Sequence, residues 1–137
     1  MSGTTKTRTV QSRKTKQRAA IQDVIEKASR PLSVAEVLEG ASRYVEGIGI
    51  ATVYRAIGDL IAEGALAAVE IPGEPTRYEM AGKSHHHHFQ CEQCQRLFDI
   101  EGCIENIKKL LPPKFRLNDH AVTLYGLCAA CGSRRTA

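Results

Sequence analysis

Apolar residues recur at helical spacing in three segments of the first half of the chain. They do so between Lys16 and Ala28, after Ser33, and within "IATVYRAIGDLIAEGAL" at residues 50–66. Side chains three or four residues apart lie on one face of a helix, so each segment can bury one face against a core. The pattern therefore predicts three amphipathic helices. Ser33 with Glu36 three residues later indicates a capping box at the start of the second.

The period then changes from helical to alternating. Gly64 is expected to end the third helix, and the segments "LAAVEI" and "TRYEMA" then flank "PGEP" at residues 72–75. The prolines and the glycine of "PGEP" favour a turn, so the two segments predict a hairpin. Three helices followed by such a hairpin, or wing, are typical of a winged helix-turn-helix.

The second half of the chain predicts a smaller unit of mixed structure. The small and polar residues of "AGKS", residues 81–84, suit a linker. Beyond it, the pattern indicates strands at His87–Cys91 and Leu97–Ile100, a helix over Cys103–Leu111 ended by two prolines, and a third strand in "AVTLYGL". We therefore expect an α+β fold that divides near residue 82, with a winged-helix domain at 1–82 and a small α/β domain at 83–137.

The net charge of +4 conceals an uneven distribution. Residues 1–18 carry six basic residues and no acidic one, so this arm is strongly positive. A basic arm on a nearly neutral body favours nucleic acid as a partner, with a merely solvated tail as the alternative. The sequence has no run of about 18 apolar residues that would predict a membrane span, and its N-terminus lacks the apolar segment of a secretory signal. We expect a cytoplasmic protein.

Five cysteines, four of them in two Cys-x-x-Cys pairs, indicate a metal site. Zn²⁺ prefers four ligands in a tetrahedron, and each pair can supply two thiolates from one tight turn. In a reducing compartment such pairs favour metal binding over disulfides, with a redox pair or an iron–sulfur cluster as alternatives. We expect structural zinc at Cys91, Cys94, Cys128 and Cys131. Cys103 is interpreted as a small buried residue, with a metal ligand or a reactive thiol as alternatives.

Four consecutive histidines precede the first cysteine pair, at residues 85–88. If the run enters a strand, successive side chains point to opposite faces. His85 and His87 then form one imidazole pair and His86 and His88 another, and each pair can begin a separate metal site. The alternative is an exposed polar loop that binds metal only adventitiously. Candidate ligands to complete the sites are Glu79, Asp99, Glu101, Glu105, Asp119 and His120.

Five motifs follow one another from about residue 13 to 131: "TKQRAAI", "IGIATVYRAIGDLIAEG", "RYE", "HHHHFQCEQC" and "DHAVTLYGLCAAC". In this combination and order the chain resembles the ferric uptake regulator family of metal-dependent bacterial repressors. The resemblance implies a homodimer whose winged helices bind a double-stranded DNA operator and whose C-terminal halves pair. It also places the recognition helix at about Ala51–Glu63.

The resemblance implies DNA contacts from the arm and from the recognition helix. Arg13 or Lys14 matches the position that reaches into the minor groove, and Thr52 one that contacts a phosphate. Tyr54 would contact a thymine methyl group or a phosphate, and Arg55 a base or the backbone. These roles suit the chemistry of the side chains. The alternative for Tyr54 is a ring packed in the core.

For metal binding, the resemblance implies two sites that agree with the alternation of the histidines. The regulatory site, near the hinge between the domains, matches Glu79, His86, His88 and Asp99. The second site, in the dimerisation half, matches His85, His87, Glu105 and His120.

Two positions depart from the family pattern. Many members carry a further histidine ligand before the second helix, where this chain has "RPLSVAE". The zinc-sensing branch often brings a cysteine to the hinge site, where this chain has Glu79 and Met80. Without the extra histidine the hinge site would be four-coordinate, which favours Zn²⁺, whereas its carboxylates favour Fe²⁺ or Mn²⁺.

We therefore expect a dimeric, metal-dependent repressor of metal-homeostasis genes, with zinc favoured as the sensed metal. The alternatives are an iron-, manganese- or peroxide-responsive repressor of the same family, or a DNA-binding module with purely structural metals. A metallohydrolase would need an open coordination position and a substrate cleft, for which the small second half leaves little room. We expect no enzymatic activity and no small-molecule substrate.

Overall fold

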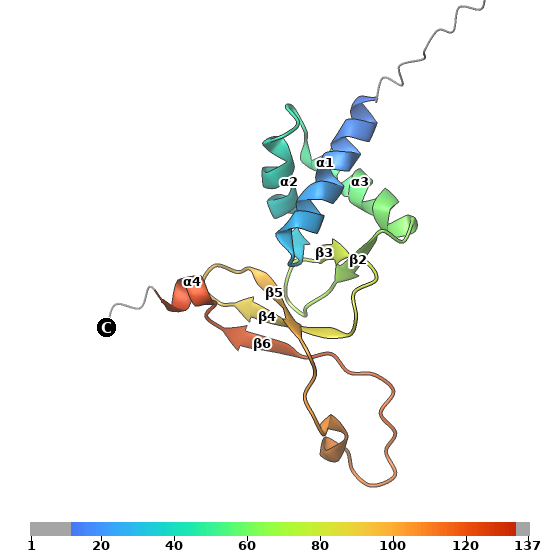
Figure 1. Ribbon diagram of the computed structural model, residues 1–137, viewed down its shortest axis with the longest axis vertical. Helices are drawn as coiled ribbons and strands as arrows, with labels where there is room; N and C mark the ends of the chain where they lie inside the picture. Colours follow the sequence, from blue (N-terminus) through green and yellow to red (C-terminus); the bar gives the residue numbers. More distant parts are fainter. Residues whose placement is uncertain (1–11, 134–137) are drawn as a thin grey trace, which may run out of the picture.

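Residues 12–133 of the chain are described by the computed structural model (Figure 1). Three helices and a small sheet form one part of the molecule, and a second sheet with a long loop forms the other. Two basic residues of the arm, Lys6 and Arg8, lie outside the described residues. Within residues 12–133, no helix is long and apolar enough to cross a membrane.

Helix α1 (Arg13–Ala28) begins three residues before the start that the apolar pattern predicts. A cap outside the apolar stripe explains the difference, because the Thr15 backbone N–H donates to Ser12 Oγ across 3.2 Å. The helix ends at Ser29, which takes the left-handed conformation with φ 54°. One face of α1 then packs into the core through Ile21 and Ile25.

Helix α2 (Val34–Ser42) starts with the predicted capping box. The Glu36 backbone N–H donates to Ser33 Oγ, and the Ser33 N–H donates to Glu36 Oε1, each across 3.2 Å. These bonds satisfy N–H groups that the start of a helix leaves without partners. Arg30 forms an ion pair with Glu36 across 2.6 Å, which further fixes the entry of the chain into the helix.

Helix α3 (Ile50–Ala62) lies within one residue of the range predicted for the third helix. Gly64 follows it with φ 78°, a conformation that glycine adopts without strain, so the chain can turn back toward the hairpin. The three helices pack around one core. Its most buried members include Ile21, Ile25, Val37, Val53, Ile57 and Leu60.

A three-stranded antiparallel sheet closes this half in the order β1-β3-β2. Strands β2 (Leu66–Val69) and β3 (Arg77–Met80) form the predicted hairpin. Strand β1 (Leu32–Ser33) pairs with β3 and escaped prediction, because two residues are too few to carry an alternating pattern. The helices and this sheet together form a winged helix-turn-helix.

The second sheet has the order β5-β4-β6. Strands β4 (His86–Cys91) and β5 (Leu97–Glu101) are antiparallel, whereas β6 (Thr123–Gly126) runs parallel to β4. The bounds of all three strands lie within two residues of the predicted ones. Since β4 is central and follows directly from the connection after β3, the histidine run enters the sheet at the junction of the two halves. Residue 82 lies in this connection, and the domain boundary expected there stays a prediction.

The helix predicted over Cys103–Leu111 is wrong. Only a single 3-10 turn, η1 (Ile107–Leu110), forms in this segment. Asn106 precedes it in the left-handed conformation with φ 64°, which breaks the helical run. None of the residues of the turn is buried, and a short helix needs a face that packs on a core. The segment lies instead in the long loop that extends away from the sheet between β5 and β6 (Figure 1).

Candidate metal centres and nucleic-acid interface

The sulfur atoms of four cysteines lie together beyond the end of β4. Cys91 ends β4 and Cys94 follows in a turn. Cys128 is the N-cap residue of the short helix α4 (Ala129–Gly132), and Cys131 lies within that helix. The four sulfur atoms lie within 4.8 Å of one another, and Cys94 Sγ is 3.8 Å from Cys128 Sγ. Thiolates bound to tetrahedral Zn²⁺ at about 2.3 Å stand about 3.8 Å apart. The arrangement therefore fits a zinc ion held by four cysteines.

Backbone donors and burial act in opposite directions on these thiols. The backbone N–H groups of Cys128 and Cys94 donate to Cys91 Sγ and lower the pKa of Cys91 to about 6. Burial and the neighbouring thiols raise the pKa of Cys131 to about 12. A divalent cation stabilises thiolates, so it would offset the penalty for ionising Cys131. The chemistry of the four side chains thus agrees with their geometry.

A second group of ligand atoms joins the two sheets. Glu79 lies on β3, His86 and His88 on β4, and Asp99 on β5, and their ligand atoms lie within 4.8 Å of one another. We name these four residues the hinge cluster. His86 Nε2 is 2.9 Å from Glu79 Oε1. His88 and Asp99 face each other in the register of β4 and β5, with His88 Nε2 3.4 Å from Asp99 Oδ1.

The nitrogen and oxygen atoms that face the inside of the hinge cluster have lone pairs available for a cation. His86 Nδ1 lies 2.8 Å from the Ser84 carbonyl oxygen, which can only accept, so Nδ1 carries the proton and the lone pair of Nε2 faces inward. His88 Nε2 and Asp99 Oδ1 are buried without a hydrogen-bond partner among the described residues. Buried polar atoms without partners are costly unless something binds them. The hinge cluster therefore fits a bound metal ion.

Lys83 binds the outer oxygens of both carboxylates in the hinge cluster. Its Nζ lies 2.6 Å from Asp99 Oδ2 and 3.3 Å from Glu79 Oε2. The other oxygen of each carboxylate faces the two histidines. Lys83 thus leaves each carboxylate one free oxygen, and the cluster presents two oxygens and two nitrogens.

The electrostatics of the hinge cluster also favour a cation. Burial and the neighbouring Asp99 raise the pKa of Glu79, because two carboxylates this close repel each other when both are ionised. Burial and the neighbouring His86 lower the pKa of His88, which keeps its imidazole neutral and able to bind. A cavity of about 490 Å³ opens beside the cluster, and Ile25 of α1, His86 and Asp99 are among the residues that line it.

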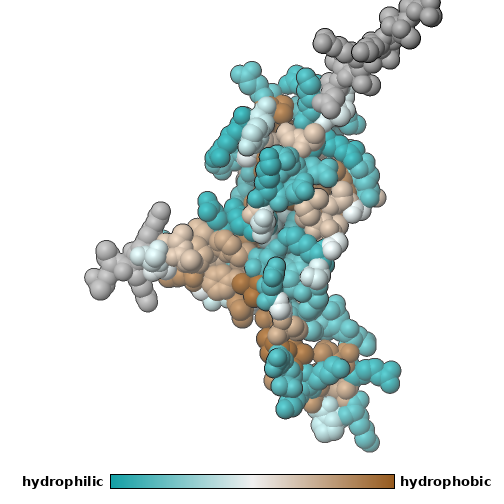
Figure 2. All heavy atoms as spheres, viewed as in Figure 1, coloured by the Kyte–Doolittle hydropathy of each residue, from teal (hydrophilic) through white to brown (hydrophobic). Residues whose placement is uncertain are grey.

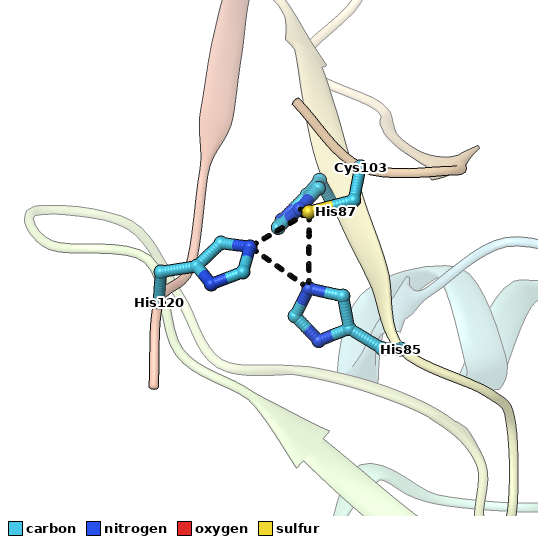
Figure 3. Close-up of side chains that lie close together, drawn as sticks. All are labelled: His85, His87, Cys103 and His120. Carbon is cyan, nitrogen blue, oxygen red and sulfur yellow. Dashed lines mark hydrogen bonds between the residues drawn. The ribbon is translucent and has the colours of Figure 1, made fainter. Parts of the chain in front are cut away.

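His85 and His87, the odd-numbered histidines of the run, lie with Cys103 and His120 in a third group of ligand atoms. Figure 3 shows these side chains converging from the start of β4 and from the loop between β5 and β6. We name His85, His87, Cys103 and His120 the imidazole cluster. His85 Nε2 is 3.1 Å from His120 Nε2. Cys103 Sγ is 2.9 Å from His120 Nε2, 3.4 Å from His87 Nε2 and 3.8 Å from His85 Nε2.

Cys103 and Glu105 differ from what the sequence led us to expect. Cys103 is exposed rather than buried. Gly102, with φ 91°, turns the chain at the end of β5, so the next side chain faces the histidines. Glu105 is exposed, and its carboxylate is not among the ligand atoms that converge in this part of the described chain. The sulfur of Cys103 lies where the resemblance led us to expect the carboxylate of Glu105.

Helices α1 and α3 enclose a cleft of about 510 Å³ that contains three of the residues expected to contact DNA, Lys14, Thr52 and Arg55. Tyr54 is 57% exposed, so its ring does not belong to the core. Arg13 is exposed at the first residue of α1. All five side chains expected to contact DNA therefore lie on α1 or α3, and none of them is buried.

The sequence does not indicate the contact of Lys83. This residue stands in "AGKS", which carries no metal-binding pattern, and it approaches the carboxylates after a turn at Gly82 with φ 83°. For Cys103 the sequence favours a small buried residue, and a metal ligand is only one of the alternatives. No spacing rule indicates either contact, because both depend on turns at glycines with positive φ.

Residues 9–125 match the model of the family described as "Ferric uptake regulator family". The chain is 32% identical over 91 residues to the ferric uptake regulation protein of Campylobacter jejuni, a match that covers 64% of this chain and 58% of that protein. It therefore spans less than two thirds of that relative. It is 30% identical over 103 residues to the ferric uptake regulation protein of Legionella pneumophila, which covers 73% of this chain and 76% of that protein.

Solved structures show the same fold. The ferric uptake regulator of Helicobacter pylori, described as having three functional metal-binding sites, superposes with a TM-score of 0.66 at 26% identity, over 88% of this chain and 83% of that one. A zinc-bound manganese uptake regulator superposes with a TM-score of 0.70 at 26% identity, over 82% of this chain and 87% of that one.

Proposed function

Because the chain belongs to the ferric uptake regulator family, we propose that it is a metal-responsive transcriptional repressor that senses zinc. It binds a double-stranded DNA operator as a homodimer and controls genes of metal homeostasis. The observation that carries this proposal is the hinge cluster, whose ligand atoms come from both halves of the chain.

The hinge cluster connects the proposed domains at 1–82 and 83–137. Glu79 belongs to the wing strand β3, whereas His86, His88 and Asp99 belong to the second sheet. A divalent ion supplies bonds between the two sides. The four side chains then hold the DNA-binding half and the dimerisation half of a chain at one fixed angle. Only certain angles let the recognition helices of both chains of the dimer enter the major groove together. Metal thus acts by shifting the population toward the DNA-binding conformation.

The donor set of the hinge cluster favours zinc. Two imidazole nitrogens and two carboxylate oxygens face inward, while Lys83 holds the outer oxygens of Glu79 and Asp99. Four such donors suit tetrahedral Zn²⁺, whereas Fe²⁺ and Mn²⁺ prefer more ligands and more oxygen. Cys91, Cys94, Cys128 and Cys131 would hold a separate, structural zinc ion.

The proposed DNA contacts are divided between α3 and α1. Tyr54 and Arg55 project from α3 toward the major groove, where Arg55 reads a base edge or binds the backbone and Tyr54 meets a thymine methyl group or a phosphate. Thr52 binds a phosphate. Arg13 and Lys14 at the start of α1 contact the backbone or the minor groove, and their charge makes that contribution dependent on salt. Four of these side chains are exposed and Thr52 is half-buried, which supports the assignment.

Exposed apolar side chains on the second sheet support a homodimer. Leu124 and Tyr125 of β6 are 48% and 57% exposed, and Leu127 just beyond is 42% exposed. Figure 2 shows apolar surface over this part of the molecule. Strand β6 also lies at the edge of its sheet, where its outer side has no partner strand within residues 12–133. Association through this surface would bury both the apolar side chains and the edge.

Operator binding at controlled free metal concentrations tests this function. We expect the affinity for operator DNA to rise with free Zn²⁺ and the affinity for random DNA to change little. Responses to Fe²⁺ or Mn²⁺ at lower free concentrations than to Zn²⁺ would instead identify an iron or manganese sensor. An operator affinity that does not change with the concentration of any of these metals would identify a DNA-binding module with purely structural metals.

A further inference from the structure

The imidazole cluster contains a sulfur atom where the family resemblance suggests a carboxylate. Cys103 is exposed, and its sulfur lies within 3.8 Å of one nitrogen atom of each of three histidines. His87, the deepest of the three, is only 4% exposed and aims Nε2 into the cluster. Figure 3 shows the three rings and the sulfur pointing toward one another. The cluster is separate from the four-cysteine group and from the hinge cluster.

We propose that Cys103 is a metal ligand, that His85 and His120 are its co-ligands, and that the ion bound there is of the zinc type, Zn²⁺ or Co²⁺. Around a tetrahedral ion with bonds of about 2.0 Å to nitrogen and 2.3 Å to sulfur, two nitrogens stand about 3.3 Å apart and a nitrogen and a sulfur about 3.5 Å apart. The distance between the two nitrogens is 3.1 Å, and their distances to the sulfur are 2.9 and 3.8 Å.

His87 acts on the sulfur rather than on the ion. The Val122 backbone N–H donates to His87 Nδ1 across 3.2 Å, so this nitrogen carries the lone pair. The proton of the neutral ring is therefore on Nε2, which lies 3.4 Å from Cys103 Sγ. His87 donates this proton in a hydrogen bond to the thiolate and fixes its position. Water takes the remaining coordination position, since His85 and Cys103 are both exposed.

The sulfur decides which ions the cluster accepts. Thiolates prefer Zn²⁺ and Co²⁺, whereas Mn²⁺ and Mg²⁺ prefer oxygen. With Glu105 in place of the sulfur, the site would be open to the harder ions. Cys103 therefore narrows the choice of ion at a site that lies outside the hinge cluster. This inference does not depend on the proposed regulation of DNA binding.

Cobalt spectroscopy of the full-length chain tests the proposal. The four-cysteine site is first filled with one zinc ion per chain, and Co²⁺ is then added. The hinge cluster offers only nitrogen and oxygen, so a sulfur-to-cobalt charge-transfer band in the ultraviolet must come from Cys103. We expect this band, and we expect it to saturate at one cobalt per chain in His86→Ala, which disables the hinge cluster.

Matched variants assign the ligands. Cys103→Ser should abolish the band while one zinc per chain is retained, and Glu105→Gln should leave the band unchanged. His87→Ala should keep the band and weaken cobalt binding by about tenfold, as expected for the loss of a partner that orients a ligand. Absence of the band in the unchanged chain, or its persistence in Cys103→Ser, would overturn the proposal. Loss of the band in His87→Ala would overturn the role given to His87.

Discussion

Lys83 determines which oxygens of the hinge cluster are free. Its ammonium group lies against the outer oxygens of Glu79 and Asp99, and both carboxylates therefore offer a single oxygen to an ion. The pKa of Lys83 is raised, because its hydrogen bond to Asp99 and the charge of Glu79 outweigh the opposing effect of burial. Lys83 thus remains charged, and it favours a four-coordinate site over one in which carboxylates bind through both oxygens.

Lys83→Met should weaken the preference of the hinge cluster for Zn²⁺ over Mn²⁺. Without the ammonium group both carboxylates can bind through two oxygens, which suits an ion of higher coordination number. We expect the ratio of the two affinities to fall by about tenfold, the usual cost of losing a group that orients a ligand. Competition binding of the two ions measures this ratio. Lys83→Arg should preserve it, and an unchanged ratio in Lys83→Met would contradict the role of Lys83.

Cys94→Ser should act through stability. The free energy of binding a structural zinc ion is also free energy of folding. We expect the loss of one zinc ion per chain and a fall in Tm of at least roughly 10 °C, since a loss of about 2 kcal/mol already lowers Tm by this much in a small domain. Metal analysis and thermal unfolding measure both effects. Cys103→Ser is the matched control, and it should keep this zinc ion. A chain with Cys94→Ser that retained both its zinc and its Tm would contradict a four-cysteine site.

Single residues could be predicted from the sequence where a local rule places them. The spacing of Cys91 and Cys94 brings two sulfurs to one turn, and the strand period separates His86 from His87. The partners of these residues were harder to predict. Cys103 joins the imidazole cluster from a turn at Gly102, and no periodic pattern extends through such a turn.

At the scale of secondary structure elements, the capping box of α2 was predictable because its two partners are three residues apart. Local sequence patterns failed at two elements. Strand β1 has two residues, and its pairing with β3 depends on a segment more than forty residues away. The segment Cys103–Leu111 has the composition of a helix, but it lies in an exposed loop without a core to pack on.

Ser33→Ala should destabilise the winged-helix half by about 1 kcal/mol, because it removes the oxygen that accepts the Glu36 N–H at the start of α2. Denaturant unfolding gives the change in the free energy of unfolding. Ser42→Ala is the matched control at the other end of the same helix, since Ser42 is exposed and its hydroxyl only donates to the Leu38 carbonyl. If the two substitutions lowered the free energy of unfolding equally, the hydrogen bond of the Ser33 cap would not stabilise the helix more than an ordinary exposed hydroxyl does.

At the scale of the whole molecule, charge and shape divide the DNA-binding task between α1 and α3. Lys14→Ala should weaken binding to operator and random DNA alike, and should lower the slope of log affinity against log salt by about one unit for one lost phosphate contact.

Arg55→Ala should instead cost about 1–3 kcal/mol of binding free energy on the operator and less on random DNA. Salt titrations with both DNAs measure these effects. Equal losses on both DNAs for Arg55→Ala would make it a backbone contact.

The fold as a whole followed from order along the chain: three helices, a hairpin, a linker and a small mixed sheet. The parallel pairing of β6 with β4 was not predicted, because the long loop between β5 and β6 separates its partners in sequence. That pairing places the segment containing His120 beside the odd-numbered histidines. The composition of the imidazole cluster therefore depends on a long-range contact that local patterns do not indicate.

The central claim is that one run of histidines serves two separate sites because β4 alternates its side chains. The most direct test is operator affinity against free Zn²⁺ for His85→Ala, His86→Ala, His87→Ala and His88→Ala. We predict that the two even-numbered variants each need at least about tenfold more Zn²⁺, and that combining them adds little, since both remove ligands of one site. The two odd-numbered variants should retain the zinc response of the unchanged chain. Four equivalent curves, with no grouping by face of the strand, would contradict the account.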